Sequence, residues 1–164
     1  MQMHVISALV ENRSGVLTRM SGMLTRRDIN IQSLTVSSCE KMGLSRMTIT
    51  IMSNKEELEQ AEKQLNKLVE VVKISTLHKS SSIIRDLCLV RVNAKDTKIR
   101  GEIIQIVDAY RGKIVDISLN TMTIEITDDP RRIDKLIEML RAYGIKKLLR
   151  TGVTAISMNG ANGE

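Results

Sequence analysis

The sequence predicts an α+β protein built from two tandem domains that share one order of elements, βαββαβ. Its length of 164 residues is enough for two domains of about 75 residues each. Apolar residues alternate with polar ones in some segments, which indicates strands, and recur every three or four residues in others, which indicates helices. The order of these segments in the first half recurs in the second half without clear residue identity, so the repeat is architectural.

The first half contains all six elements of one such unit. Each strand is predicted from a β-branched or alternating run, each helix from an apolar stripe, and Asn54 is expected to cap the second helix. The predicted elements are a strand at Val5–Val10, a helix from Val16 to Leu24, a hairpin formed by residues 33–37 and 47–51, a helix from Leu58 to Leu68, and a strand at Val69–Leu77.

The second half repeats this order after a short polar linker at His78–Ser82. Its second helix is expected to open at Asp128, Asp129 and Pro130, because acidic residues before a proline are typical of a helix start. The predicted elements are a strand at Ile83–Val92, a helix from Ile99 to Tyr110, strands at Lys113–Leu119 and Met122–Thr127, a helix bearing Ile133 to Leu140, and a strand at Ile145–Ile156.

A βαββαβ unit folds as a four-stranded antiparallel sheet with both helices on one face, the ferredoxin-like arrangement. We therefore expect one domain at residues 1–78, a second at 83–158, and a flexible tail at 159–164. Because the other sheet face is bare and an edge strand is unpaired, we expect the chain to associate with itself as a homodimer.

Composition excludes several classes of protein. Hydrophobic residues make up 42% and charged residues 27%, which is typical of a soluble globular chain, and no apolar run exceeds the four residues Leu87–Val90. The N-terminus lacks the pattern of a secretory signal, so we expect a cytoplasmic protein without membrane contact. Cys39 and Cys88 are too far apart for a metal knuckle or a CxxC motif, which favours free thiols.

The net charge of +6 does not indicate nucleic-acid binding. Residues 1–80 have 11 basic and 8 acidic groups and residues 81–164 have 14 and 11, so the excess is spread evenly. The chain has no Phe and no Trp and only two Tyr, which leaves almost no rings on which bases could stack. A weakly basic surface suits an acidic protein partner instead.

No group of residues suggests catalysis or metal binding. The two histidines, His4 and His78, have no nucleophile and orienting acid nearby in the sequence, and no glycine-rich phosphate loop is present. Asp128 and Asp129 could be metal ligands or acid and base groups, but their place before Pro130 favours a helix cap. We expect no catalytic residue and no metal in this chain.

The start of the first helix is the informative feature. Helix starts expose unpaired N–H groups and a partial positive charge, which proteins usually offset with their own carboxylates. The other three predicted helices do so with Glu56 and Glu57, with Asp96, and with Asp128 and Asp129. The first helix has no acid from Asn12 to Arg27, and Arg13 adds a positive charge. Such a start is a site for an outside anion, which Gly15 would let approach the backbone closely.

Neighbouring residues suggest what that anion belongs to. Asn12 and Asn30 offer amide groups for an ammonium, and an apolar wall is offered by Val16, Leu17 and Ile31. Together they describe an aliphatic α-amino acid. The structural alternative is that Asn12 or Ser14 caps the helix and Gly15 only eases the turn.

Four runs of the first half, at residues 11–17, 26–36, 45–49 and 62–69, carry a resemblance to a known family. They resemble the small, regulatory subunit family of acetohydroxyacid synthase, also called acetolactate synthase. The similarity covers the whole chain and is strongest over residues 3–78, which look like an ACT domain. In the second half, Tyr110–Asp116 resembles the family stretch "FRG-IVD" with Tyr110 in place of Phe, and Arg150–Gly152 resembles "R-SG".

The resemblance implies a non-catalytic subunit with an amino-acid-binding ACT domain and an ACT-like C-terminal domain. It implies activation of a separate catalytic subunit, which uses thiamine diphosphate, Mg and FAD, and feedback inhibition by valine in branched-chain amino-acid synthesis. It also places valine between two protomers, with Asn12, Ser14, Gly15, Val16 and Leu17 from one chain and Asn30 and Ile31 from the other. The alternatives are a sensor of another aliphatic amino acid that controls a different enzyme, and an RNA-binding ferredoxin-like module.

Overall fold

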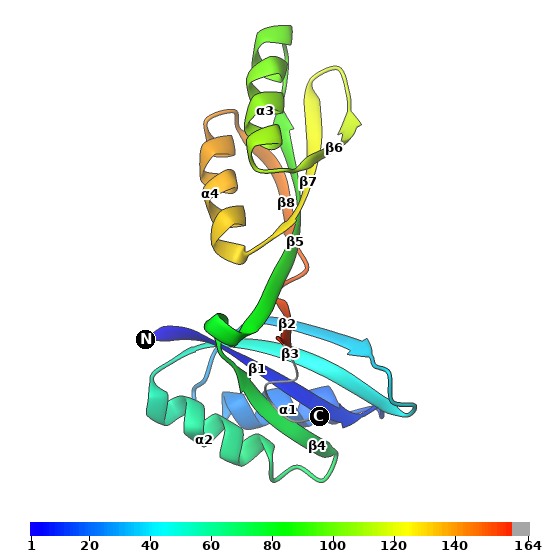
Figure 1. The fold of residues 1–164 in the computed structure, drawn as a ribbon, viewed down its shortest axis with the longest axis vertical. Coiled ribbons are helices and arrows are strands. Elements are labelled where there is room, and N and C mark those ends of the chain that lie inside the picture. The colour runs from blue at the N-terminus through cyan, green and yellow to red at the C-terminus, as the bar shows by residue number, and fades with distance from the viewer. Residues whose placement is uncertain (159–164) are drawn as a thin grey trace. The chain divides into compact units, whose positions relative to one another are not determined.

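The computed structural model describes residues 1–158, which form two compact units (Figure 1). The first unit contains Met1–Ile83 together with the described residues from Val153 onward, and the second contains Ile84–Gly152. The predicted tail at 159–164 lies outside the described residues. No helix in the described part of the chain is long and apolar enough to cross a membrane.

The first unit is a four-stranded antiparallel sheet with two helices on one face (Figure 1). The strand order is β2-β3-β1-β4, so β2 and β4 are the edges. Its elements are β1 (Gln2–Glu11), α1 (Val16–Thr25), β2 (Ile31–Ser38), β3 (Leu44–Ser53), α2 (Lys55–Leu65) and β4 (Val71–Leu77). The core lies between sheet and helices, where Ile6, Ala8 and Val10 of β1 meet Met20 and Leu24 of α1.

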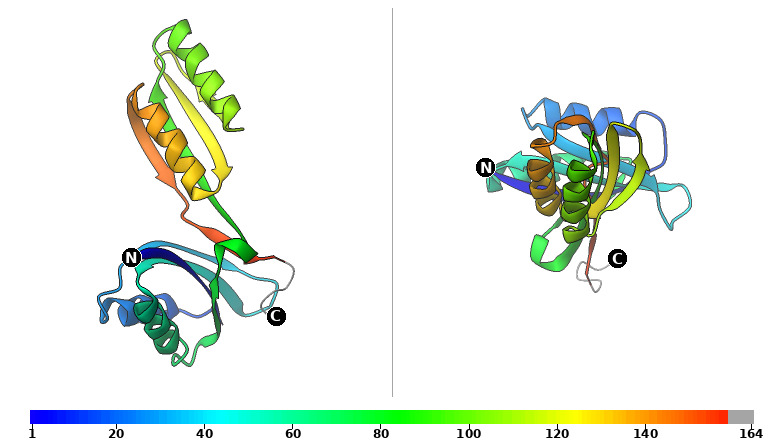
Figure 2. Two further views of the ribbon diagram at one scale, coloured as in Figure 1. Left: turned by 60° about the vertical axis from the view of Figure 1, so that its left-hand side comes forward. Right: turned by 90° about the horizontal axis from the view of Figure 1, so that it is seen from above.

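The second unit repeats this architecture with the order β6-β7-β5-β8. Figure 2 shows its two helices on one face of the sheet. The short 3-10 turn η1 (Lys79–Ser81) precedes it, and its elements are β5 (Ser82–Asn93), α3 (Thr97–Ala109), β6 (Lys113–Ile117), β7 (Thr121–Asp128), α4 (Pro130–Arg141) and β8 (Ile145–Arg150). The core consists of alternate residues of β5 and β7 packed against α3 and α4. The prediction of two ferredoxin-like domains is confirmed.

The three helix starts predicted to be capped by the protein's own side chains are capped. Asn54 forms a complete capping box on α2, and the Asp96 carboxylate accepts a hydrogen bond from the Ile99 N–H at the start of α3. The Asp129 carboxylate accepts from the Arg131 N–H at the start of α4, and Pro130 occupies the first turn. Asp128 and Asp129 therefore act as the predicted helix start.

The C-terminal strand differs from the prediction. The expected strand at Ile145–Ile156 is two strands, β8 and β9 (Thr154–Ser157), separated at Gly152, whose φ of 87° breaks the extended backbone. After this break the chain rejoins the first unit, whereas the expected second domain extended to residue 158. Like β8, β9 pairs with β5, and the mixed apolar and polar residues between Ile145 and Ile156 do not reveal that the chain passes into the first unit after Gly152.

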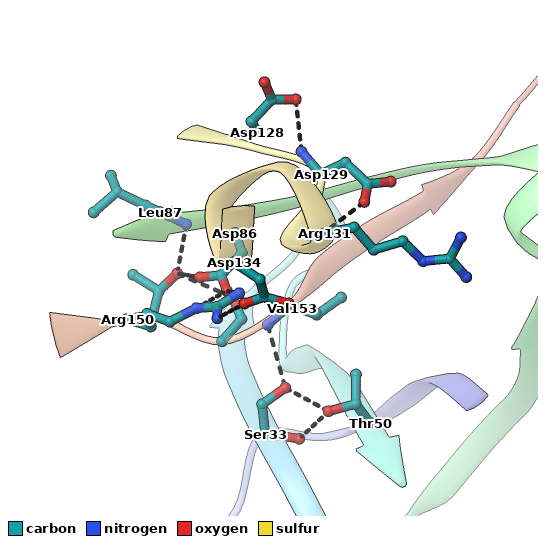
Figure 3. Close-up of polar contacts among 12 residues, drawn as sticks. Ser33, Thr50, Asp86, Leu87, Asp128, Asp129, Arg131, Asp134, Arg150 and Val153 are labelled. Carbon is teal, nitrogen blue, oxygen red and sulfur yellow. Dashed lines mark hydrogen bonds and ion pairs between the residues drawn. The ribbon is translucent and has the colours of Figure 1, made fainter. Parts of the chain in front are cut away.

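The face of the first sheet opposite its helices is not bare, contrary to the expectation. Val153 is 5% exposed and bonds to β2: its N–H donates to Ser33 Oγ at 3.2 Å and its carbonyl accepts from Thr35 Oγ1 at 2.9 Å. Ser33 also bonds to Thr50 of β3 (Figure 3). The prediction was wrong because the covering strand comes from the other end of the chain.

Smaller differences concern element ends and side-chain exposure. The fourth strand begins at Val71 rather than Val69, and the strand expected to reach Leu119 ends at Ile117. Val69 and Leu119 are 88% and 86% exposed, so neither has the packing that would extend a strand. Cys39 and Cys88 are free thiols, as predicted.

Candidate functional site

The start of α1 lacks a side-chain cap. Gly15 is the N-cap residue with a φ of 83°, in the left-handed region, and no side chain forms a capping hydrogen bond. The structural alternative, in which Asn12 or Ser14 caps the helix, is therefore wrong. The first turn of α1 contains no acidic residue, as the sequence predicts. Its N–H groups are left for solvent or an outside anion.

The charges near this start are more balanced than the sequence alone suggests. Arg13 pairs with the neighbouring Glu11. Arg19, one turn into α1, pairs with Glu70 through its Nη2 at 2.7 Å from Oε1. Glu70 immediately precedes β4 and is 17% exposed at its side chain. Both arginines thus have acidic partners, and the remaining positive potential comes mainly from the helix backbone.

Arg19 also limits the space at Gly15. A Cβ added to Gly15 would lie 3.1 Å from the Arg19 Nη1 atom. The guanidinium therefore lies beside the N-cap residue, where it can donate to an anion held by the first turn. Arg19 follows Gly15 by four residues on the same helix face, and this spacing is a signal by which sequence reasoning could have found it. Nothing local in the sequence relates Glu70 to it.

The five candidate residues in the turn and the first helical positions differ in exposure. Asn12, Ser14 and Gly15 are exposed, and the Asn12 N–H donates to the Gly43 carbonyl at 2.8 Å. Leu17 is 42% exposed, whereas Val16 is 2% exposed and belongs to the core. Leu17 is therefore available to contact the apolar part of a ligand, whereas Val16 packs in the core between α1 and the sheet.

The remaining two candidates, Asn30 and Ile31, lie at the opposite end of α1. Ile31 pairs with Ile51, which pairs with His4 near the start of β1, whereas Asn12 follows the last residue of β1. At ~3.3 Å per residue, the eight steps from His4 to Asn12 place the two groups about 26 Å apart along β1 within one chain. One chain does not bring them together, so a joint site requires a second copy.

Residues 86–151 contain a polar cluster that has no counterpart among the predicted sites. Asp86 is 2% exposed and receives Arg150 Nε at 2.7 Å and Nη2 at 2.6 Å, a two-point ion pair (Figure 3). Arg150 Nη1 reaches Asp134 at 2.5 Å, and Thr151 Oγ1 donates to Asp86 at 3.3 Å while accepting from the Leu87 N–H. The cluster fixes the end of β8 against β5.

Possible metal ligands and the buried thiol are the remaining chemical features of residues 1–158. That part of the chain has no cluster of three or more His, Cys, Asp or Glu side chains that could hold a metal ion. Burial raises the pKa of the Cys88 thiol to about 11, with smaller contributions from nearby charges, so this thiol stays protonated near neutral pH.

Two family models together match most of the chain. One, described as the AHAS small subunit-like ACT domain, matches residues 6–73, and the other, described as the small subunit of acetolactate synthase, matches residues 85–159. The probable acetolactate synthase small subunit of Methanothermobacter thermautotrophicus is 47% identical over 154 residues, covering 94% of this chain and 92% of the relative. The chain belongs to the family of acetolactate synthase small subunits.

Other small subunits extend this similarity to sequence and structure. The acetolactate synthase small subunit of Mycolicibacterium smegmatis is 43% identical and covers 94% of this chain and 90% of its own length. The crystal structure of the small subunit from Thermotoga maritima superposes with a TM-score of 0.87 at 35% identity, over 96% of this chain and 98% of that one. As a small subunit with an ACT domain, this chain has a regulatory role within an enzyme complex that includes a catalytic partner.

Proposed function

We propose that this small subunit activates the catalytic subunit of acetolactate synthase and makes it sensitive to feedback inhibition by valine, in the synthesis of branched-chain amino acids. Family membership supports the partner, and the uncapped start of α1 supports the effector site. The observation on which the effector proposal rests is that α1 alone, among the four helices of residues 1–158, lacks a side-chain cap.

Each part of valine has a counterpart among the exposed candidates. The carboxylate accepts hydrogen bonds from the first-turn N–H groups beside Gly15, with Ser14 at the edge and Arg19 close enough to add a charged donor. The ammonium donates to the amide oxygens of Asn12 and Asn30. The isopropyl group lies against Leu17 and Ile31, which are the partly exposed apolar residues of the set.

The separation of the two groups of candidates requires two chains. Because Asn30 and Ile31 lie about 26 Å from Asn12 along one β1 strand, at ~3.3 Å per residue, a single chain supplies only part of the contacts. We therefore propose a homodimer in which each valine lies between the α1 start of one protomer and the β2 start of the other. In such a site valine binding and dimer geometry are linked.

Valine would then act by shifting a population. Bound across two chains, it stabilises one relative placement of the ACT domains, and the catalytic subunit responds differently to that placement. A coupling free energy of ~1 to 3 kcal/mol is enough for strong inhibition. The thiamine diphosphate, Mg and FAD that the reaction uses belong, in this proposal, to the catalytic subunit, and the complex works in the cytoplasm.

A substitution at Gly15 tests the effector site. Gly15→Asp places a carboxylate where the ligand carboxylate is proposed to bind, and Gly15→Asn has nearly the same shape and the same backbone strain without the charge. We expect both variants to activate the catalytic subunit, and the Asp variant to lose valine sensitivity far more completely than the Asn variant. Catalytic rates measured across a valine titration, with calorimetry of valine binding to the small subunit, provide the readout.

The outcomes separate the two halves of the proposal. Equal valine sensitivity in the Asp variant and the parent would refute the α1 site while leaving the activating role intact. An Asn30→Ala variant with unchanged valine affinity would remove the second protomer from the site. Failure of the parent subunit to raise the rate of the catalytic subunit would refute the activating role itself.

A further inference from the structure

We propose that the two hydrogen bonds between β2 and Val153 couple the effector site to the C-terminal segment, so that valine binds more tightly while Val153 is attached to β2. This inference rests on the valine site proposed above, because Asn30 and Ile31 lie at the start of β2, just before Ser33. It makes Ser33 and Thr35 positioning residues, which act on the response to the effector without contacting it.

A bulge in β2 lies between the effector residues and this attachment. Ile31 pairs with Ile51 and Ser33 pairs with Thr50, so Gln32 is an extra residue on β2. In a regular strand, residues 31 and 33 would point to the same face. Because of the bulge, Ile31 packs against the core beneath the helices, whereas Ser33 points to the opposite face. A bulge re-aims the side chains beside it, so the position of the β2 start and the direction of the Ser33 hydroxyl depend on each other.

Side chains of β2 hold both backbone groups of Val153. Ser33 Oγ accepts the Val153 N–H at 3.2 Å, and Thr35 Oγ1 donates to the Val153 carbonyl at 2.9 Å. Ser33 Oγ also lies 2.6 Å from Thr50 Oγ1, which donates to the Ser33 carbonyl at 3.5 Å (Figure 3). Because the Thr50 hydroxyl uses its proton in that bond, the Ser33 hydroxyl donates to Thr50 and keeps a lone pair for Val153.

Gly152 separates this attachment from a second pair of hydrogen bonds. Its φ of 87° lies in the left-handed region, which glycine adopts without strain. On its other side, the Thr151 N–H donates to the Leu87 carbonyl of β5 at 3.0 Å, and Thr151 Oγ1 accepts from the Leu87 N–H at 3.2 Å. Residues 151 and 153 are thus each fixed by two hydrogen bonds. The attachment of Val153 therefore determines whether Gly152 is held at both ends.

The direction of the coupling follows from what a valine at the β2 start requires. Valine bound between that start and the α1 start of the partner protomer holds the β2 start in one position. The same position keeps the Ser33 hydroxyl directed at Val153, so valine favours the attached state. Such coupling is reciprocal, and loss of the attachment must lower the affinity for valine by the factor by which valine strengthens it. The attached state is therefore the inhibited one.

Variants of the two bonding side chains test the coupling in the complex of the small and catalytic subunits. Ser33→Ala removes the acceptor for the Val153 N–H, and Thr35→Val removes the donor to the Val153 carbonyl with little change of shape. One such hydrogen bond corresponds to about a fivefold change in an equilibrium constant. We therefore expect each variant to raise the valine concentration for half-inhibition about fivefold, and to activate the catalytic subunit as the parent does when valine is absent.

Two controls separate this coupling from a general weakening of β2. Ser33→Thr keeps a hydroxyl at the bonding position, and Ser37→Ala removes an exposed hydroxyl from the same strand, so both should keep the valine response of the parent. Hydrogen exchange adds a readout that a purely structural role would not change. Valine should slow exchange in residues 153–157 of the parent and of both controls, and should slow it far less in Ser33→Ala.

The outcomes distinguish this inference from the effector site on which it rests. Half-inhibition of Ser33→Ala and Thr35→Val at the valine concentration of the parent would overturn the coupling and leave the valine site intact. Exchange in residues 153–157 that does not respond to valine, in a parent complex that valine inhibits, would do the same. An equal loss of valine response in Ser37→Ala would assign the effect to β2 as a whole and overturn the role of the bonds to Val153. A parent complex that valine neither binds nor inhibits would refute the effector site itself.

Discussion

Removing the guanidinium of Arg150 should destabilise the second unit strongly. Asp86 is 2% exposed, and two of its contacts come from this one side chain, at 2.7 and 2.6 Å. An Arg150→Met variant keeps much of the apolar stem but leaves a buried carboxylate with only the Thr151 hydroxyl, at 3.3 Å. Breaking a buried pair from one side typically costs ~3 to 5 kcal/mol.

Asp134 provides a matched control because it contacts the same guanidinium from the surface. Its side chain is 60% exposed, and an exposed ion pair is worth ~0 to 1 kcal/mol, so Asp134→Asn should have a small effect. The double variant Asp86→Leu/Arg150→Met replaces the buried pair by apolar groups and should recover much of the loss. These differences are measured as changes in urea midpoint at constant slope.

Two results would contradict this reasoning. One is an Arg150→Met variant no less stable than Asp134→Asn, which would mean that Asp86 does not depend on its ion pair. The other is a double variant no more stable than Arg150→Met alone, which would mean that the cost comes from lost packing and not from an unpaired buried carboxylate.

Three further predictions concern other parts of the fold. Cys88 is buried and should resist thiol reagents until the chain unfolds. Because folding raises the pKa of its thiol from 9.0 to about 11, the contribution of Cys88 to the free energy of unfolding is complete below pH 9 and is lost as the pH rises through 11. Urea midpoints measured over a pH series test this dependence. Asn54→Ala removes the capping box of α2 and should lower the free energy of unfolding by ~1 kcal/mol, and no change in thermal melting would argue against the cap. Ser33→Ala removes the acceptor for the Val153 N–H and should speed hydrogen exchange in residues 153–157, whereas Ser37→Ala, on the same strand and exposed, should not.

Local signals in the sequence were sufficient for most of the architecture. The spacing of apolar residues predicted the order of strands and helices. Each element buries one face, so its buried apolar residues recur every second position in a strand and every third or fourth position in a helix. Acidic residues and Pro130 likewise predicted the start of α4, because capping depends on neighbours in sequence. Both the type of each element and the capping of each helix depend on residues that are close together in the sequence.

Tertiary partners could not be predicted in this way. After the break at Gly152, Val153 bonds to Ser33 and Thr35 of β2, which lie more than a hundred positions earlier in the sequence. The same limit applies at the α1 start, where the absence of a cap follows from nearby residues but Glu70 reaches Arg19 only through the fold. The burial of Val16 could have been expected from its place on the apolar stripe, which assigns it to the core and not to a ligand.

The return of the chain from the second unit has a consequence for biosynthesis. As the polypeptide leaves the ribosome, its N-terminal sheet and helices can form early, but the strand that shields the opposite surface of that sheet is among the last parts to be made. Until Val153 emerges and bonds to Ser33, the nascent sheet presents Ser7, Leu9 and Thr50 to solvent. The first unit is therefore the first to be synthesised and the last to be completed. A chain that terminates before β9 would leave this face of the sheet exposed, and chaperones that bind exposed apolar surface would recognise it.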